Sequence, residues 1–370
     1  MTAPPRALID DLLELARIPA PTFDEGERAD WIEQRLAYAP GTCARDATGN
    51  VIWSWGQGRP ELLVCAHLDT VFDRATPHTI RERGDVIEGP GCGDNAAAVV
   101  VAISAVEELL GAPDGLKPGA VAFTVGEEGL GNLVGAYAAC RALEPRRVLA
   151  LEGHGVHRMA IDCVGSLRAR VRVTGPGGHS WAHRTRPSAI DALLGLAQTL
   201  KAVEPAGAAD SSVNLGTIAG GRSVNAIADS AELVIERRAL DEAPLDAFAA
   251  LLEGLRVEPP LGLELELLGR RPAGRGDRSD RLAVVAREVR ASMGLSCEDV
   301  AGSTDANAAM ALGIPAICLG CADGADMHTT RERIEIASLA LGREQVLRVI
   351  RALLLGVIPS GGIEPPSLGL

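Results

Sequence analysis

The spacing of apolar residues in the first 160 positions predicts strands that alternate with helices. Short continuous apolar runs stand at 62–66, 120–125 and 148–151, and each is typical of a strand that is buried on both faces. The longer apolar stretch at 96–110 has the length of a helix. Because buried strands that alternate with helices favour parallel pairing, this part of the chain predicts an α/β fold with a mostly parallel sheet.

A different pattern begins near residue 163. Apolar residues alternate with arginines between Leu167 and Val173, which indicates a strand with one exposed face. The segments that follow are typical of a helix, two strands, a second helix and a last strand, at 187–203, 213–218, 231–237, 244–255 and 261–267. The order β-α-β-β-α-β predicts a ferredoxin-like α+β domain.

The buried pattern of the first segment returns in the last hundred residues. It predicts a strand at 314–319 and a helix at 337–355. The sequence therefore predicts one α/β domain built from residues 1–162 and 271–370, interrupted by an inserted α+β domain at 163–270. A chain of 370 residues is long enough for two domains. The Pro/Gly-rich tail at 359–362 is expected to be loosely held.

Composition and charge exclude several classes of protein. The chain has 49 acidic and 36 basic residues, a formal net charge of −13, and therefore lacks the basic surface that nucleic-acid binding needs. The N-terminus shows no signal-peptide pattern, and the most apolar stretch, 96–106, is too short to span a bilayer. Eight cysteines in a chain this long do not make a disulfide framework. We therefore expect a cytoplasmic protein with no nucleic-acid or membrane partner.

Polar side chains follow three of the predicted buried strands. His67 ends the first, Glu127 and Glu128 follow the second, and Glu152 ends the third. In α/β sheets this edge is where ligands bind. Two adjacent carboxylates repel each other unless they are exposed or neutralised by a cation. Asp69, two residues after His67, is placed to anchor an imidazole that binds a metal.

Two further candidates lie in glycine-containing loops. Asp94 precedes the helix at 96–110, where an ordinary helix N-cap is the alternative interpretation. His328 lies in a loop before the C-terminal helix. Two imidazoles with three carboxylates form a mixed nitrogen and oxygen donor set, which suits zinc, manganese or cobalt and differs from a thiolate site. Five ligands are too many for one tetrahedral zinc ion but suit two metals that share a bridging carboxylate.

As an ordered set, the motifs resemble those of the co-catalytic zinc peptidases, the family of peptidase T, glutamate carboxypeptidase, acetylornithine deacetylase and the aminoacylases. The resemblance covers nearly the whole chain, including the inserted domain. The motifs that carry it are His67-Leu68-Asp69, Gly93-Asp94-Asn95, Gly126-Glu127-Glu128-Gly129, Glu152, Gly175-Pro176-Gly177-Gly178-His179-Ser180 and Met327-His328-Thr329. The fold that the resemblance implies is a zinc-peptidase catalytic domain with an inserted lid or dimerisation domain.

The resemblance also implies a metal site. Asp94 would bridge two divalent ions, most commonly zinc, with cobalt or manganese as alternatives, and the peptide bond from Asp94 to the next residue is often cis. His67 and Glu152 would complete the coordination of one metal ion, and Glu128 and His328 would complete that of the other.

Further roles follow from the same resemblance. Glu127 would be the general base, and Asp69 would orient the histidine two residues before it. His179 would stabilise the tetrahedral intermediate, and in dimeric relatives it reaches the partner's active site. Asn225 matches a substrate-contacting position, and Arg271 matches one that binds a substrate carboxylate. The alternatives are a turn residue for Asn225 and a solvated charge for Arg271.

These features predict a metal-dependent hydrolase that cleaves a peptide or amide bond of a small peptide. An N-acyl amino acid deacylase is the alternative, because Asn95-Ala96 resembles peptidase T whereas Glu152 resembles the deacylases. A non-catalytic metal or peptide-binding protein is less favoured since Glu127 is present. The glycine spacing disfavours a nucleotide-binding oxidoreductase, and no Gly-x-Ser-x-Gly motif indicates a serine hydrolase. A homodimer through edge strands of the inserted domain is a further expectation.

Overall fold

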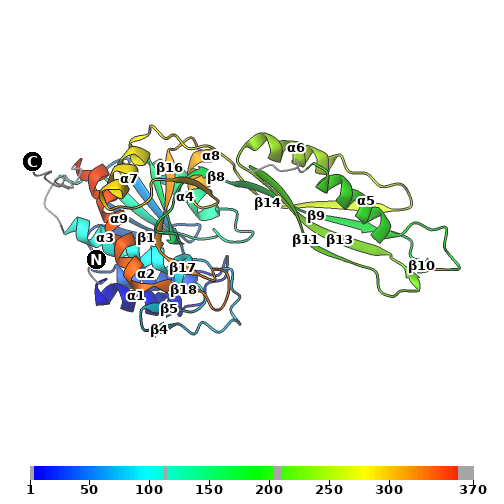
Figure 1. The fold of residues 1–370 in the computed structure, drawn as a ribbon, viewed down its shortest axis with the longest axis horizontal. Helices are drawn as coiled ribbons and strands as arrows, with labels where there is room; N and C mark the ends of the chain where they lie inside the picture. The colour runs from blue at the N-terminus through cyan, green and yellow to red at the C-terminus, as the bar shows by residue number, and fades with distance from the viewer. Residues whose placement is uncertain (1–3, 112–114, 204–209, 357–370) are drawn as a thin grey trace, which may run out of the picture. The chain divides into compact units, whose positions relative to one another are not determined.

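The computed structural model describes residues 4–111, 115–203 and 210–356. The tail at 359–362 lies outside these residues. The chain divides into two compact units (Figure 1). Unit 1 contains the residues up to Asp162 and from Gly276 onward, and unit 2 is Cys163–Arg275.

Unit 1 is built on a large sheet of eight strands among the described residues. The four central strands β6, β3, β7 and β16 are parallel, whereas β2 and β8 pair antiparallel on either side of them. In spatial order the strands are β1 (Thr42–Arg45), β2 (Val51–Trp55), β6 (Gly119–Thr124), β3 (Leu62–His67), β7 (Val148–His154), β16 (Ala316–Ala322), β8 (Met159–Cys163) and β15 (Asp299–Gly302).

Helices cover both faces of this sheet (Figure 1). Every residue of β3 and β6 is buried, as the continuous apolar runs predict. One face packs against α1 (Arg6–Ala16), α2 (Gly26–Arg35), α3 (Ala98–Leu110), α7 (Arg281–Ser292) and α9 (Ile336–Leu355), and α4 (Val134–Leu143) contacts α8 (Ala306–Ala311) outside this core. The predicted α/β class with a mostly parallel sheet is confirmed. In the part of the chain that the structure describes, no helix combines the length and the apolar character needed to cross a bilayer.

A small antiparallel sheet stands beside the large one in unit 1. Its order is β17 (Gly324–Ala325), β18 (Arg333–Glu335), β5 (Val86–Glu88) and β4 (Arg81–Arg83). The loop between β17 and β18 carries His328, whose φ is +62°.

The segment before α3 contains an irregular turn that the sequence does not predict. Asp94 and Asn95 have non-helical backbone angles within an irregular turn at Cys92–Ala97, and regular helix begins only at Ala98. Hydrogen bonds to distant parts of the chain hold this turn. The side-chain amide of Asn95, for example, donates to the carbonyl of Leu151 at 2.9 Å. The N-cap residues of this turn and of α3 are Gly91 and Ala97, so Asp94 is not an ordinary N-cap. The Asp94–Asn95 peptide bond is cis.

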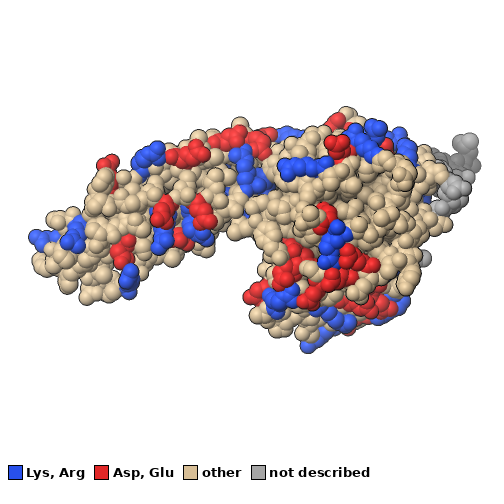
Figure 2. Space-filling model, turned by 180° about the vertical axis from the view of Figure 1, so that it is seen from behind, with Lys and Arg blue, Asp and Glu red and all other residues tan. Residues whose placement is uncertain are grey.

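Unit 2 has an antiparallel sheet covered by helices on one face. The strand order is β11 (Ser211–Gly220), β13 (Ser230–Ala239), β9 (Gly165–Thr174) and β14 (Gly262–Arg271), and the helices are α5 (Ala189–Lys201) and α6 (Glu242–Glu253). The apolar residues of β9 are buried in the core that includes both helices. The arginines of β9 pair with glutamates on β13 and β14, such as Arg168 with Glu236 at 2.8 Å. Figure 2 shows these opposite charges side by side on unit 2.

Candidate metal centre

The five side chains predicted to bind metal come together in unit 1. The Nε2 atom of His67 lies 3.1 Å from Oδ1 of Asp94 and 3.6 Å from Oε2 of Glu152. The Nε2 atom of His328 lies 2.9 Å from Oδ2 of Asp94 and 3.3 Å from Oε1 of Glu128. Asp94 therefore stands between the two imidazoles, with a different carboxylate oxygen nearest to each.

The parallel strands explain how residues distant in sequence reach one place. His67 ends β3 and lies opposite Thr124, the last residue of β6, so the loop after β6 brings Glu128 to the same edge. Glu152 is the fifth residue of β7, the other neighbour of β3. Asp94 lies in the irregular turn before α3. This edge is formed by the carboxyl ends of the parallel strands, where α/β sheets bind ligands.

The donor set fits divalent cations. Ligand atoms of His67, Asp94 and Glu128 lie within 4.8 Å of one another, and all three residues are buried. Oδ1 of Asp94 is buried and has no partner of hydrogen-bonding geometry among the described residues. Because a buried carboxylate is unfavourable unless it is paired, this oxygen is suited to bind a cation. Nitrogen and carboxylate donors together are typical ligands of zinc, manganese and cobalt.

The pKa values of two of these groups reflect the crowding of acids. Hydrogen bonds to Asp94 and Glu128 raise the pKa of His328 to about 10. Burial, with the nearby charge of Asp94, raises the pKa of Glu152 to about 7, although His67 acts in the opposite direction. Both shifts favour the protonated form, which is a cation at His328 and a neutral acid at Glu152, and both therefore reduce the net negative charge of the group.

Asp69 connects the first strand end to the loop that carries the glutamates. Its buried carboxylate accepts the backbone N–H of Glu127 at 3.0 Å and that of Glu128 at 2.8 Å. Nδ1 of His67 lies 3.0 Å from the backbone carbonyl oxygen of Asp69 and 3.4 Å from its carboxylate. The residue thus contacts the His67 ring mainly through its main chain, while its carboxylate holds the Glu127–Glu128 backbone.

Two residues that the sequence analysis missed lie behind Asp94. The fully buried carboxylate of Glu332 accepts the backbone N–H of Asp94 at 2.8 Å and lies 2.6 Å from Nε2 of His154. A Cβ atom at Gly93 would stand 2.3 Å from that nitrogen and 2.7 Å from the carboxylate, so only glycine fits there. Glu332 is four residues after His328, but the sequence gives no sign that it reaches back to residue 94.

A buried arginine offsets part of this negative charge. Arg28 is fully buried, and its Nη1 donates to the carbonyl of Leu68 at 2.9 Å. Leu68 is the residue between His67 and Asp69. Burial lowers its pKa to about 10, while the charges of Asp69, Glu332 and Asp94 act in the opposite direction. The side chain thus remains a cation at neutral pH and supports the strand end.

The other predicted site residues belong to unit 2. His179 lies on the short strand β10 (Gly178–His179), which pairs with β12 (Ala226–Ile227), so Asn225 stands close by and its carbonyl accepts the Ser180 N–H at 3.0 Å. Arg271 is buried and pairs in register with Ser166, at the end of β9 that is farther from His179. Within unit 2, the structure brings His179 and Asn225 together and leaves Arg271 apart from them.

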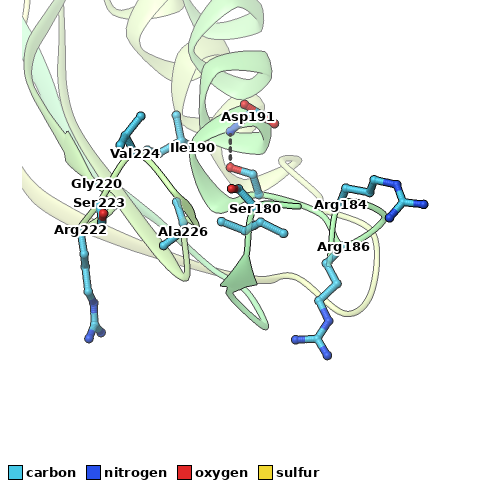
Figure 3. A pocket seen from close by; sticks show the side chains of 14 residues that line it. Ser180, Arg184, Arg186, Ile190, Asp191, Gly220, Arg222, Ser223, Val224 and Ala226 are labelled. Carbon is cyan, nitrogen blue, oxygen red and sulfur yellow. Dashed lines mark hydrogen bonds between the residues drawn. The ribbon is translucent and has the colours of Figure 1, made fainter. Parts of the chain in front are cut away.

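A hollow of about 590 Å³ lies beside this part of unit 2 (Figure 3). Ser180, Ser223 and Val224 are among the residues that line it. The side chains of Arg184 and Arg186 extend outward in this view. The guanidinium of Arg184 stacks on the Trp181 ring at 5.3 Å from its centroid.

Comparisons with known proteins agree with this geometry. The model of peptidase family M20/M25/M40 matches residues 63–352. N-acetyl-L-citrulline deacetylase of Xanthomonas campestris is 27% identical over 310 residues, which are 80% of this chain and 82% of that protein. A tripeptidase from Staphylococcus aureus superposes with a TM-score of 0.78 at 20% identity, over 95% of this chain and 99% of that one. A dinuclear metal-binding peptidase of the M20 family, the Bacillus subtilis YXEP protein, superposes with a TM-score of 0.67 at 16% identity, over 95% of this chain and 99% of that one.

Proposed function

The chain belongs to peptidase family M20/M25/M40, as its ordered motifs predict, and is an enzyme that acts on peptide or amide C–N bonds; we propose that it hydrolyses the amide bond of a small peptide at a pair of divalent metal ions, preferably zinc. One observation carries this proposal. The buried carboxylate of Asp94 lies between two imidazoles, and each imidazole has one further carboxylate beside it.

The proposed ligands divide into two sets that share Asp94. His67 and Glu152 would hold one ion, and Glu128 and His328 would hold the other, while cobalt or manganese would also suit these donors. When bound, such a metal pair lowers the pKa of a water molecule toward neutrality. Glu332 supports this arrangement because its carboxylate fixes the backbone N–H of Asp94.

Glu127 is the proposed general base. It is buried beside Glu128, and its backbone N–H is held by Asp69. A carboxylate fixed in this way accepts the proton of the attacking water and later delivers it to the leaving amine. The same Asp69 carboxylate also accepts the backbone N–H of Glu128, so one side chain anchors the backbone of the proposed base and of a proposed metal ligand.

His179 is the proposed donor to the oxyanion of the tetrahedral intermediate. Its Nδ1 accepts the backbone N–H groups of Trp181 at 3.1 Å and Ala182 at 3.4 Å. In a neutral imidazole the proton then resides on Nε2, which makes that nitrogen a donor. We propose that unit 2 acts as a lid, and that Asn225 and Arg271 contact the substrate there, Arg271 through a substrate carboxylate.

A deacylase of N-acyl amino acids is the second candidate. The 27% identity to N-acetyl-L-citrulline deacetylase over most of both chains favours it. The likeness to a tripeptidase over nearly the whole of both chains supports the peptidase. Both reactions attack an amide carbonyl and would use the same metal centre.

A second copy of the chain is the proposed partner, paired through the edge strand β11. This strand contains no charged residue, and apart from Val213 its ten residues are at least partly exposed, including Leu215 and Ile218. A long edge strand without charged residues is suited to sheet extension. Analytical ultracentrifugation would detect such a dimer, and Ile218→Lys would weaken it.

The test of the proposed function combines metal analysis with hydrolysis. Purified protein should carry close to two transition-metal ions per chain, and a chelator should abolish hydrolysis of di- and tripeptides or N-acyl amino acids until metal is restored. Glu127→Gln should retain the metal and lose about a hundred- to ten-thousandfold in turnover. Near-normal turnover of this variant would remove Glu127 as the base, and metal-free activity would remove the metal mechanism.

A further inference from the structure

The segment between α1 and α2 is attached to both loops that carry proposed catalytic groups. The Thr70 N–H donates to the carbonyl of Ala20 at 2.8 Å. The Thr22 hydroxyl donates to the Asp69 carboxylate at 2.9 Å, and the Glu25 carboxylate accepts the Gly126 N–H at 3.0 Å. These bonds fix residues 20–25 against the strand end of His67 on one side and the Glu127–Glu128 loop on the other.

Phe23, within this segment, has a strained backbone and an exposed ring. Its φ is +71°, a conformation that bulky residues rarely adopt. The buried carboxylate of Glu25 holds it there by accepting the Phe23 N–H at 2.9 Å. Core packing does not account for this strain, because 66% of the residue remains exposed. Strain of this kind persists where the surrounding structure enforces it, most often at ligand sites.

Phe23 is one of several exposed apolar residues that lie beside proposed site residues, either in space or in the sequence. A Cβ atom at Gly126 would lie 3.5 Å from Cε1 of Phe23 and 2.8 Å from Cγ2 of Val134, so both side chains flank the residue before Glu127. Other exposed apolar residues stand within two positions of Asp69, Glu128 and His328 in sequence. We call the whole group the apolar rim: Phe23, Val71, Leu130, Val134 and Met327.

The charges next to Phe23 favour an apolar ligand over an acidic one. Arg74 is bound by Asp24 at 2.6 Å and by Glu27 at 2.6 Å, so these two carboxylates compete with a substrate carboxylate for its charge. Acidic side chains gather on the face of unit 1 that Figure 2 shows. An apolar group placed beside the ring would bury surface that water now covers.

We propose that Phe23 is a specificity-determining residue, one wall of a subsite for a branched or aromatic apolar group next to the scissile amide. This inference rests on the proposed function, because it places that subsite beside Glu127 and Glu128. The substrate class is therefore a small peptide or N-acyl amino acid whose group beside the cleaved bond is apolar, whether it lies on the acyl or the amine side.

The kinetic test compares substrates of nearly equal size. Metal-reconstituted enzyme is given dipeptides in which leucine, asparagine or glycine occupies either side of the bond, together with the matching N-acyl amino acids. We expect kcat/KM for leucine to exceed that for asparagine by at least about tenfold on one side of the bond. Phe23→Ala should reduce this ratio about 10- to 100-fold, a range typical of apolar pockets, and Phe23→Leu should retain most of it.

A matched control separates selectivity from folding. Tyr38→Ala removes an exposed aromatic side chain of unit 1 outside the rim and should change neither activity nor the ratio. Thermal unfolding and metal content should be equal in all variants. If Phe23→Ala lowers kcat/KM equally for every substrate, or if the wild-type enzyme shows no apolar preference, the subsite does not exist.

A binding measurement decides the inference independently of turnover. Calorimetric titration of metal-loaded protein with leucine hydroxamate and asparagine hydroxamate should show at least about tenfold tighter binding of the leucine compound. Phe23→Ala should abolish that difference. Equal binding of both compounds to the wild-type protein would overturn the subsite even if hydrolysis is observed. Apolar-selective binding without any hydrolysis would uphold the subsite and refute the proposed function.

Discussion

The candidate metal centre of unit 1 and the His179 loop of unit 2 are built in different ways. In unit 1, His67, Asp94 and Glu128 are buried, and each is held by contacts to side chains or backbone far away in the sequence. In unit 2, His179 is exposed, and its ring accepts hydrogen bonds from the backbone of its own loop. One site is assembled by the folding of its unit, whereas the other presents a single donor to solvent.

This difference indicates that the two regions contribute to different steps, metal binding in unit 1 and turnover in the His179 loop. A centre whose ligands are fixed by packing is organised before metal or substrate arrives, which reduces the cost of binding. An exposed donor does its work only when a substrate is beside it, so its effect should appear in turnover alone. Substitutions in unit 1 should therefore change metal binding, and substitutions in the His179 loop should leave it intact.

The largest effect is expected at the carboxylate shared by the two proposed metal ions. Asp94→Ala should lower affinity for both ions by more than the roughly 100-fold that loss of an outer partner costs, and turnover should become undetectable. Metal content by elemental analysis and amide hydrolysis are the measurements. Asp10→Asn is the matched control, because Asp10 is an exposed aspartate whose carboxylate pairs with Arg6. Loss of one ion with the other held at full affinity would contradict a bridging role.

A smaller effect, confined to turnover, is expected in unit 2. His179→Ala should lower kcat about 100- to 1,000-fold, the cost of removing one oxyanion donor, with metal content unchanged. His179→Gln, which keeps an N–H group, should recover part of that loss. Steady-state kinetics and elemental analysis on the same preparations provide both values. An unchanged kcat in the alanine variant would exclude this residue from catalysis, and loss of metal would end the contrast between the two units.

Much of the fold of unit 1 was predictable because its strands are buried on both faces. The continuous apolar runs in β3 and β6 have the length and composition typical of strands in a parallel sheet, and every residue of both strands is buried. The irregular turn before α3 was not predicted, because hydrogen bonds from Asn95 and Asp94 to distant residues hold it and the apolar pattern at 96–110 gives no sign of them. Periodicity reports burial along one element and contains no information about such distant partners.

The same limit applies to the candidate site. His67, Glu128 and Glu152 could be found because each follows or ends a buried strand, where a polar residue is unusual. Glu332 and His154 could not, because their contact joins positions 178 residues apart and leaves no local pattern. Phe23 was missed for a different reason, since a strained backbone angle has no sequence signature in a residue other than glycine.

The smallest effect distinguishes a fixed centre from a merely crowded one. If the packing around Asp94 organises the site, then removing a partner that touches no metal should still weaken metal binding. Glu332→Ala removes the acceptor of the Asp94 N–H and should lower metal affinity about 10- to 100-fold. Glu332→Gln retains a carbonyl oxygen that can accept the same N–H, so this variant should lose less metal affinity than the alanine variant.

Glu335→Ala is the control for this last comparison, because Glu335 is an exposed acid on the same strand β18. Competition against a chelating dye measures affinity directly and does not depend on turnover. Equal metal affinity in all three variants would mean that the hydrogen bond from the Asp94 N–H to Glu332 is not needed to position the metal ligands. In that case burial in unit 1 would be a consequence of the sheet and not the reason for its affinity, and the contrast with the exposed His179 loop would lose its physical basis.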